Sequence, residues 1–159
     1  MKKKLLVCLA MAMCLAGFAG CGSKEEKKTE DVSMDIHSVA KEIVDNGNFT
    51  DIAEINKDKG ISQYSVGDAE IADAVTYFSS GATAEEVVIF EGATDADADK
   101  LLTAAEERKE DDYKTWQDYK PEEVSRVDKA VIKKSGKYVV FCIADDKNAV
   151  SAVIDKYFK

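Results

Sequence analysis

Residues 70–91 read EIADAVTYFSSGATAEEVVIFE, two runs rich in β-branched and aromatic residues on either side of a short polar segment. Runs of this length and composition, separated by a glycine-containing segment, predict a β-hairpin with strands over residues 70–78 and 85–91. Thr83 and Glu86 also have the spacing of a helix capping box, which favours a helix instead. The short length and β-branching of residues 87–90 decide for the strand.

A second hairpin and three helices are predicted around the first hairpin. Ser135-Gly136 separates KAVIKK from KYVVFCIA, two runs that predict another pair of strands. Apolar residues at helical spacing predict a helix over residues 34–46, a long helix over residues 95–118 with a solvated middle that reads EERKEDD, and a last helix around residues 150–157.

The predicted order of elements is therefore α-β-β-α-β-β-α. This order is typical of an α+β domain, here with a four-stranded, mainly antiparallel sheet made of the two hairpins and helices packed on one face. We expect a single domain of this kind over residues 34–159.

The first 21 residues have the pattern of a lipoprotein signal peptide. Three lysines at residues 2–4 precede an uncharged, mostly apolar run that is shorter than the roughly 18 to 20 residues needed to cross a bilayer. Phe18-Ala19-Gly20-Cys21 then resembles the lipobox of bacterial lipoproteins. We expect a signal peptide at residues 1–20 and a diacylglyceryl group on Cys21. A flexible charged tether would follow over residues 21–33, with the domain on the extracytoplasmic face of the cell membrane. Ordinary cleavage that releases a soluble protein is the alternative.

Charge and cysteine content restrict the partners of such a mature chain. Residues 1–20 hold three of the 22 basic residues and none of the 31 acidic ones, so their removal leaves a formal charge of −12. A surface this acidic repels phosphate backbones, and we expect no nucleic-acid partner. Cys142, in the run YVVFCIA, would be the only cysteine besides Cys21 and is interpreted as a small buried hydrophobic residue.

Three segments together resemble a known family. They are QYSVGDAEIADAVTYFSSGATAEEVVIFEG (residues 63–92), the stretch from Arg108 through Tyr113 and Tyr119 to Pro121, and SGKYVVFCIADD (residues 135–146). They are similar to the domain of unknown function family 4358, over about residues 35–157, with SGATAEE as the most specific part. The resemblance implies a small lipoprotein of a Gram-positive, clostridia-type bacterium. It implies no established activity and therefore assigns no catalytic residue.

The sequence lacks the motifs of the common catalytic classes. His37 is the only histidine, and there is no Gly-x-Ser-x-Gly motif, phosphate-binding glycine loop or cysteine and histidine spacing for zinc. No cofactor is expected. These observations favour a non-enzymatic module that binds an unknown ligand or an envelope protein. A cell-envelope enzyme that uses carboxylates is the alternative.

Two groups of residues are candidate binding surfaces. The segment SSGATAEE can present hydroxyl and backbone groups between two rigid strands, although it is also interpreted as a plain hairpin turn in which Gly81 takes a positive φ. An aromatic group near the end of the long helix predicts a partner surface, with packing against the sheet as the alternative. The candidate binding loop is Ser79, Ser80, Gly81, Thr83 and Glu85, and the candidate partner surface is Tyr113, Trp116 and Tyr119.

A possible metal site lies at the start of the long helix. In DADADKLLTAAE, the carboxylates of Asp95, Asp97, Asp99 and Glu106 have the spacing of ligands in a calcium-binding loop, but Lys100 stands where such a loop needs glycine. The alternative is a helix N-terminus at which Thr94 or Asp95 caps and the carboxylates favour the positive end of the helix dipole.

Overall fold

The computed structural model describes residues 33–159 of the chain. The predicted signal peptide, Cys21 and the tether up to residue 32 lie outside the described residues. No helix among residues 33–159 has both the length and the apolar composition that a membrane-spanning segment needs.

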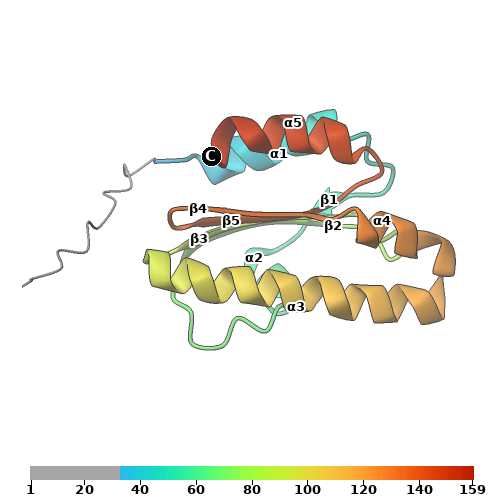
Figure 1. The fold of residues 1–159 in the computed structure, drawn as a ribbon, viewed down its shortest axis with the longest axis horizontal. Coiled ribbons are helices and arrows are strands. Elements are labelled where there is room, and N and C mark those ends of the chain that lie inside the picture. The colour runs from blue at the N-terminus through green and yellow to red at the C-terminus, as the bar shows by residue number, and fades with distance from the viewer. Residues whose placement is uncertain (1–32) are drawn as a thin grey trace, which may run out of the picture.

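A five-stranded antiparallel sheet in the order β1-β2-β3-β5-β4 forms the middle layer of this part of the chain (Figure 1). Both predicted hairpins are confirmed, and they join through the central pair β3 and β5, where Val88 lies opposite Phe141. Gly81 and Gly136 have φ values of 101° and 53°, so both hairpin turns require the freedom that glycine alone has. The strands are β1 (Ala53–Glu54), β2 (Ile71–Phe78), β3 (Glu86–Gly92), β4 (Val131–Ser135) and β5 (Tyr138–Ile143).

The prediction of four strands was wrong, because β1 adds a fifth strand at one edge of the sheet. It consists of two exposed residues that pair antiparallel with Tyr77 and Phe78 of β2. A strand of this length cannot show the alternation of apolar and polar residues that identifies strands in a sequence. The predicted order was also incomplete, since it left out three short helical elements. The helical elements are α1 (Ile36–Asn46), α2 (Lys57–Ile61), α3 (Asp95–Tyr119), a 3-10 turn η1 (Pro121–Glu123), α4 (Val124–Asp128) and α5 (Lys147–Tyr157).

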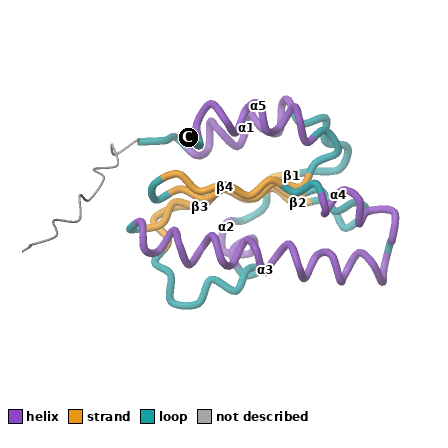
Figure 2. Tube along the Cα trace, in the orientation of Figure 1, coloured by secondary structure: helices purple, strands orange, loops and turns teal. Residues whose placement is uncertain are grey.

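Helices cover both faces of the sheet, whereas the sequence analysis predicted one covered face (Figure 2). Helices α1 and α5 pack together on one face, and α3 and α4 lie on the other. Alternate residues of β3 therefore enter different hydrophobic clusters, Val87 and Ile89 toward α1 and α5, and Val88 and Phe90 toward α3. The uninterrupted apolar runs of β3 and β5 reflect this burial on two sides.

The described part of the chain carries its own core. One cluster joins α1 and α5 to the sheet, and the other joins α3 and α4 to the opposite face. Val139, Phe141 and Ile143 of β5 all belong to the second cluster, so they face the same side of the sheet. Cys142 is fully buried in β5, and burial raises the pKa of its thiol, in agreement with its interpretation as a core residue.

The two ends of the sheet have different neighbours. The described chain begins and ends at one of them, where Ser33 and Lys159 line the same cavity and the hydroxyl of Ser135 lies 3.4 Å from the carbonyl oxygen of Lys159. The turn that joins β2 to β3 lies at the opposite end, beside α4 (Figure 1). We call this turn loop 79–85, after its residues.

Candidate functional site

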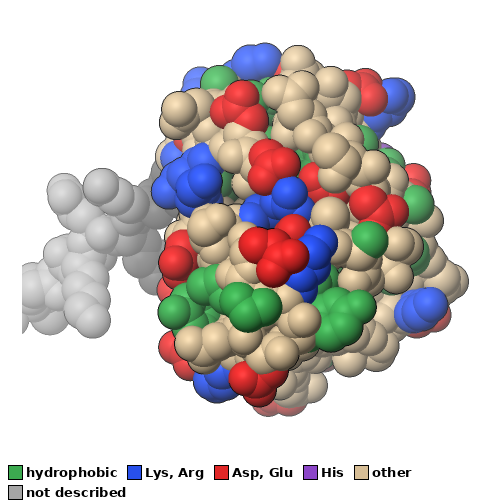
Figure 3. All heavy atoms as spheres, turned by 90° about the vertical axis from the view of Figure 1, so that its right-hand side faces the viewer, with side chains coloured by type: hydrophobic (Ala, Val, Ile, Leu, Met, Phe, Trp, Pro, Cys, Tyr) green, Lys and Arg blue, Asp and Glu red, His purple; other side chains and the backbone are tan. Residues whose placement is uncertain are grey.

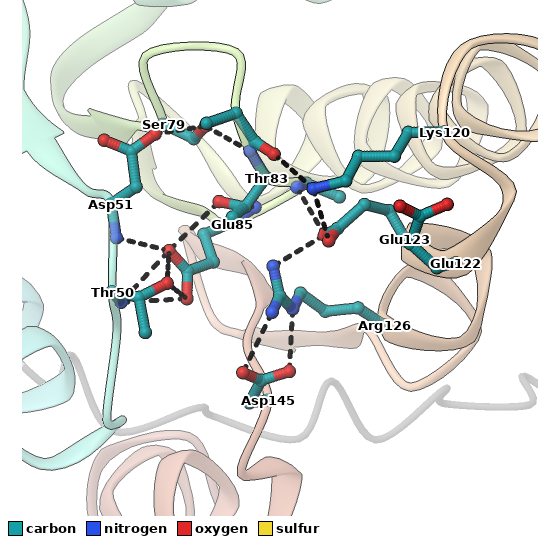
Figure 4. A network of polar contacts seen from close by, with 12 residues as sticks. Thr50, Asp51, Ser79, Thr83, Glu85, Lys120, Glu122, Glu123, Arg126 and Asp145 are labelled. Atoms are coloured by element: carbon teal, nitrogen blue, oxygen red, sulfur yellow. Dashed lines mark hydrogen bonds and ion pairs between the residues drawn. The ribbon is translucent and has the colours of Figure 1, made fainter.

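Loop 79–85 is anchored at its C-terminal end by the carboxylate of Glu85, which is only 1% exposed. This carboxylate accepts hydrogen bonds from the backbone N–H groups of Thr50 and Asp51, at 3.0 and 2.8 Å, and from the hydroxyl of Thr83 at 3.1 Å (Figure 4). Glu85 thus binds the loop to the segment that precedes β1. A carboxylate with this many donors is occupied inside the protein, so its role is to shape the loop.

The N-terminal half of the loop is fixed by Asp51. Its Oδ2 accepts hydrogen bonds from the hydroxyl groups of Ser79 and Ser80, at 3.1 and 2.7 Å, and from the backbone N–H of Ser80 at 2.9 Å. The hydrogen bond from the Ser80 hydroxyl is the main reason that the pKa of Asp51 is lowered. The Ser79 oxygen in turn accepts from the backbone N–H groups of Gly81 and Thr83. The hydroxyl groups that the sequence analysis assigned to ligand binding therefore hold the loop itself together.

A third set of contacts ties the loop to η1 and α4. The buried carboxylate of Glu123 accepts from the backbone N–H of Ala84 at 2.9 Å and pairs with Nη1 of Arg126 at 2.6 Å. Arg126 also makes a bidentate ion pair with Asp145, at 2.8 and 2.9 Å. Nζ of Lys120 donates to the carbonyl oxygen of Ala82 at 2.9 Å. Polar contacts with several other segments thus fix the shape of loop 79–85 (Figure 4).

A pocket of about 130 Å³ lies between this loop and α3. Ser79, Gly81 and Thr83 line it from the loop, and Arg108 and Trp116 line it from the helix. The structure therefore brings the candidate binding loop together with part of the candidate partner surface. Figure 3 looks onto this end of the molecule, where acidic and basic side chains lie next to one another and hydrophobic side chains are exposed beside them.

Buried charged residues extend from Arg108 into the protein. Nη2 of Arg108 lies 2.8 Å from Oε2 of Glu86 and 3.1 Å from Oδ1 of Asp112. The other oxygen of Glu86 accepts a hydrogen bond from the hydroxyl of Tyr64 at 2.5 Å. Glu86 and Asp112 are 3% and 4% exposed. We call Tyr64, Glu86, Arg108 and Asp112 the Arg108 cluster.

The Arg108 cluster is incompletely paired. Nε of Arg108 and Oδ2 of Asp112 are buried without a hydrogen-bond partner in the described part of the chain. Burial, reinforced by the charge of Glu86, raises the pKa of Asp112 to about 7, against the attraction of Arg108. Burial also raises the pKa of Glu86. Two carboxylates share one guanidinium here, so burial and their mutual repulsion favour the protonated form of one of them.

The sequence analysis missed this cluster because it interpreted EERKEDD as a solvated segment. That expectation was wrong for Arg108 and Asp112, which turn inward, although Asp111 beside them is exposed. A signal was present in the spacing. Leu101 and Ala105 are buried, and Arg108, Asp112 and Trp116 follow them at helical intervals of three or four residues. The charged pair therefore continues the apolar stripe of α3.

The three aromatic residues of the candidate partner surface do not form one surface. Trp116 lines the pocket, and its ring lies 5.7 Å from that of Tyr119, which is 70% exposed. Tyr113 is 37% exposed and lies elsewhere, in an open groove of about 650 Å³ that it lines with Ile132 of β4. Charged side chains of α3 make up most of the remaining wall of that groove.

Two of the four carboxylates of the possible calcium site have partners within the protein. Thr94 caps the helix by accepting from the backbone N–H of Asp97, and its hydroxyl donates to Asp97 at 2.7 Å, which lowers the pKa of that carboxyl. Asp99 pairs with Lys134 at 2.8 Å. Asp95 is the first residue of the helix, and Glu106 lies in the open groove. Among residues 33–159, no group of three or more histidine, cysteine, aspartate or glutamate side chains is arranged to hold a metal ion. Calcium binding at this segment stays a prediction without support from the described geometry.

The only histidine lies away from the pocket. Nε2 of His37, in α1, is 2.9 Å from Oδ2 of Asp73, which also pairs with Lys57 at 3.2 Å. The side chains of His37, Asp73 and Lys57 are 56%, 36% and 48% exposed. His37 is therefore a surface residue.

Comparison with known proteins identifies one family. The sequence model of a domain of unknown function, DUF4358, matches residues 45–144, which is more than half of the chain. No curated protein and no solved structure matches the chain significantly. The matched region includes loop 79–85, Trp116 and Arg108. Most of α1 and all of α5 lie outside it.

Proposed function

This chain belongs to the DUF4358 family of domains of unknown function, and from its site we propose that it is a non-enzymatic binding module anchored to the membrane by lipid. The ligand site is the pocket between loop 79–85 and α3. The ligand is a small molecule or a segment of an envelope component that enters between Gly81 and Trp116.

The incomplete pairing of the Arg108 cluster is the observation that carries this proposal. Buried polar atoms in folded proteins nearly always have a hydrogen-bond partner, and leaving one unpaired costs about 1 to 3 kcal/mol. Nε of Arg108 and Oδ2 of Asp112 have no partner in the part of the chain that the structure describes, and Arg108 itself lines the pocket. Buried polar groups that lower stability in this way are concentrated at functional sites. The rigid loop beside the pocket supports the same assignment, because a fixed wall loses little entropy when a ligand binds.

The anchor and the location are proposed from the sequence pattern at residues 1–21. A diacylglyceryl group on Cys21 would hold the protein on the extracytoplasmic face of the membrane, since two acyl chains make a stable anchor. The pocket lies at the end of the sheet opposite Ser33, where the described chain begins. A domain attached through residue 33 would therefore present the pocket away from its point of attachment.

An enzyme that uses carboxylates is the second candidate function. The pKa of Asp112, raised to about 7, is the observation that favours it, because a general acid or base works best with a pKa near the ambient pH. Asp112 is deeply buried, however, and reaches the pocket only through Arg108. Turnover that disappears in an Asp112→Asn variant would establish the enzyme.

A thermal-shift screen of residues 22–159 tests the binding function. The panel holds sugars, amino acids, soluble envelope fragments and divalent cations. A ligand at a hundredfold its Kd adds about 2.7 kcal/mol of stability, and each kcal/mol raises the Tm of a domain near this size by about 2 to 4 °C. We expect a hit whose shift disappears in Trp116→Ala and persists in Tyr113→Ala, the matched aromatic outside the pocket. A shift that both variants retain would place binding elsewhere, and a flat screen would contradict small-ligand binding.

A further inference from the structure

We infer that the ligand is a neutral glycan whose pyranose ring stacks on Trp116 and Tyr119 while an acetamido substituent of that ring enters the pocket. This inference rests on the proposed binding function and names the chemical class of the ligand. It follows from the aromatic pair at the mouth of the pocket, the hydrogen-bond donors that Arg108 brings to it, the local charge and the size of the cavity.

The aromatic pair at the end of α3 offers a platform for a ring with an apolar face. Trp116 forms a wall of the pocket, and Tyr119 lies against it with ring planes inclined by 56°. Tyr119 is 70% exposed, so packing in the core does not account for its position. The C–H groups on one face of a pyranose ring make an apolar surface that can stack on an aromatic ring. Large aromatic side chains with one wet and one apolar side are suited to such contacts.

Arg108 brings hydrogen-bond donors to the pocket. The carboxylates of Glu85 and Glu86 line the pocket but are almost fully buried and accept hydrogen bonds from the protein. The Arg108 side chain is 20% exposed, and its Nη1 donates no hydrogen bond within residues 33–159. A guanidinium group can only donate. The group that enters the pocket must therefore carry an acceptor oxygen.

The charges around Arg108 favour a neutral ligand. Glu86 and Asp112 already balance the guanidinium, and the chain as a whole has a formal charge of −9. An anionic ligand would be placed next to two carboxylates, and a cationic ligand would be placed next to Arg108; like charges at such distances repel strongly where water is excluded. A neutral ligand with acceptor oxygens avoids both costs.

The cavity beside the aromatic pair is small. Its volume is about 130 Å³, which has room for a compact substituent of a few heavy atoms. An acetamido group has four heavy atoms. Its carbonyl oxygen matches the donor Arg108, and its methyl group matches the apolar side chains of Phe78 and Ala84, which also line the pocket. The ring itself then lies outside, on Trp116 and Tyr119.

The fluorescence of Trp116 tests this inference directly, because Trp116 is the only tryptophan in the chain. Residues 22–159, which include both hydrophobic clusters, are titrated with the linear tetramer of N-acetylglucosamine and, separately, with cellotetraose, which lacks the acetamido groups. We expect a saturable change in Trp116 emission with the N-acetylglucosamine tetramer and at least about tenfold weaker binding of cellotetraose. Equal affinity for the two tetramers would overturn the assignment of the pocket to the acetamido group.

A matched pair of variants locates the contact. Tyr119→Ala and Tyr113→Ala each remove one exposed tyrosine from α3, and thermal unfolding verifies that both variants stay folded. We expect the Kd of the N-acetylglucosamine tetramer to rise about tenfold, or about 1.4 kcal/mol, in Tyr119→Ala and to stay unchanged in Tyr113→Ala. Equal effects of the two substitutions would overturn stacking at the pocket.

The failure of this inference and the failure of the proposed function are distinguishable. If another class of compound in the thermal-shift panel binds and its shift disappears in Trp116→Ala, the pocket is a ligand site but its ligand is not a glycan. If neither tetramer nor any other compound in the panel binds at the pocket, both the inference and the proposed small-ligand function are wrong.

Discussion

Oδ1 of Asp112 lies 3.1 Å from Nη2 of Arg108, while Oδ2 of the same carboxyl group is buried and has no hydrogen-bond partner among residues 33–159. The carboxyl group is therefore paired on one side only. Its pKa is raised to about 7, chiefly by burial and then by the charge of Glu86. This makes Asp112 a group whose protonation affects the stability of the fold at ordinary pH.

The first prediction concerns the pH dependence of stability. Because the pKa of Asp112 is higher in the folded than in the unfolded state, the folded protein binds more protons, and its stability falls as pH rises from about 4 to about 7. Asp112→Asn removes the ionisable group and with it this fall in stability. The fall amounts to about 1.4 kcal/mol of unfolding free energy for each unit by which the pKa is raised. The free energy of unfolding in urea, measured between pH 4 and pH 8 or so, should therefore favour the variant increasingly over that range. Asp111→Asn, at the exposed neighbouring position, should keep the wild-type pH profile. Parallel curves for Asp112→Asn and the wild type would show that Asp112 has an ordinary pKa.

The second prediction concerns the ion pair beneath the pocket. Arg108→Met removes the cation that lies 2.8 Å from Glu86 and leaves that carboxylate buried and unpaired. Removing one partner of a buried ion pair costs about 3 to 5 kcal/mol. The additional change Glu86→Gln removes the uncompensated charge, so the double variant should recover a large part of that loss. A double-mutant cycle from urea unfolding gives the coupling energy. Additive effects of the two substitutions would mean that Arg108 and Glu86 do not interact in solution.

The third prediction concerns the rigidity of loop 79–85. Glu85→Ala removes the acceptor for the N–H groups of Thr50 and Asp51 and for the Thr83 hydroxyl. A hydrogen bond to a charged group contributes about 1.5 to 3 kcal/mol, so we expect the loss of all three to cost at least about 3 kcal/mol. Glu122→Ala, at an exposed acidic position, is the control and should change stability by less than about 0.5 kcal/mol. Amide hydrogen exchange at Thr50 and Asp51 should also become faster in Glu85→Ala. If exchange there were unchanged, Glu85 would not be the group that holds the loop.

The sequence predicted the fold best where one physical signal dominates a long segment. Helix α3 begins at Asp95 behind a threonine cap, as one of the two interpretations of DADADKLLTAAE required, and it ends one residue beyond the predicted position. The competing capping box at Thr83 and Glu86 was correctly set aside. Glu86 begins β3, because the apolar run that follows it is buried on both faces of the sheet.

The sequence was less informative where tertiary contacts determine the role of a residue. The two residues of β1 form a strand only because β2 offers them a partner. Arg108 and Asp112 look like surface residues among other charges, and only Glu86, on a distant strand, explains why they are buried. Conversely, Ser79 and Ser80 were candidates for ligand binding, and nothing in the sequence indicates that Asp51 binds their hydroxyl groups. Trp116 was the one candidate aromatic that the structure brings to the pocket.

The fourth prediction concerns the anchor. If Cys21 carries a diacylglyceryl group, the full-length protein expressed in a Gram-positive host should appear in the membrane fraction and incorporate labelled fatty acid. Cys21→Ser should abolish the label and lower the amount of protein in the membrane fraction, because no acyl chain is then attached. Cys142→Ser, at the buried cysteine, is the control and should retain the label. If both variants kept the label, Cys21 would be excluded as the lipidation site.

The separation of the pocket from the chain ends at the other end of the sheet has an electrostatic consequence. The seven residues of β3, at about 3.3 Å each, separate the two ends by about 23 Å, which is nearly three times the Debye length of about 8 Å at physiological ionic strength. Exposed charges near Ser33 or Lys159 are therefore screened from the pocket. The affinity for the ligand should therefore not depend on the charge of the surface to which that end is attached. It should be the same on an anionic bilayer, a cationic bead and a neutral sensor surface.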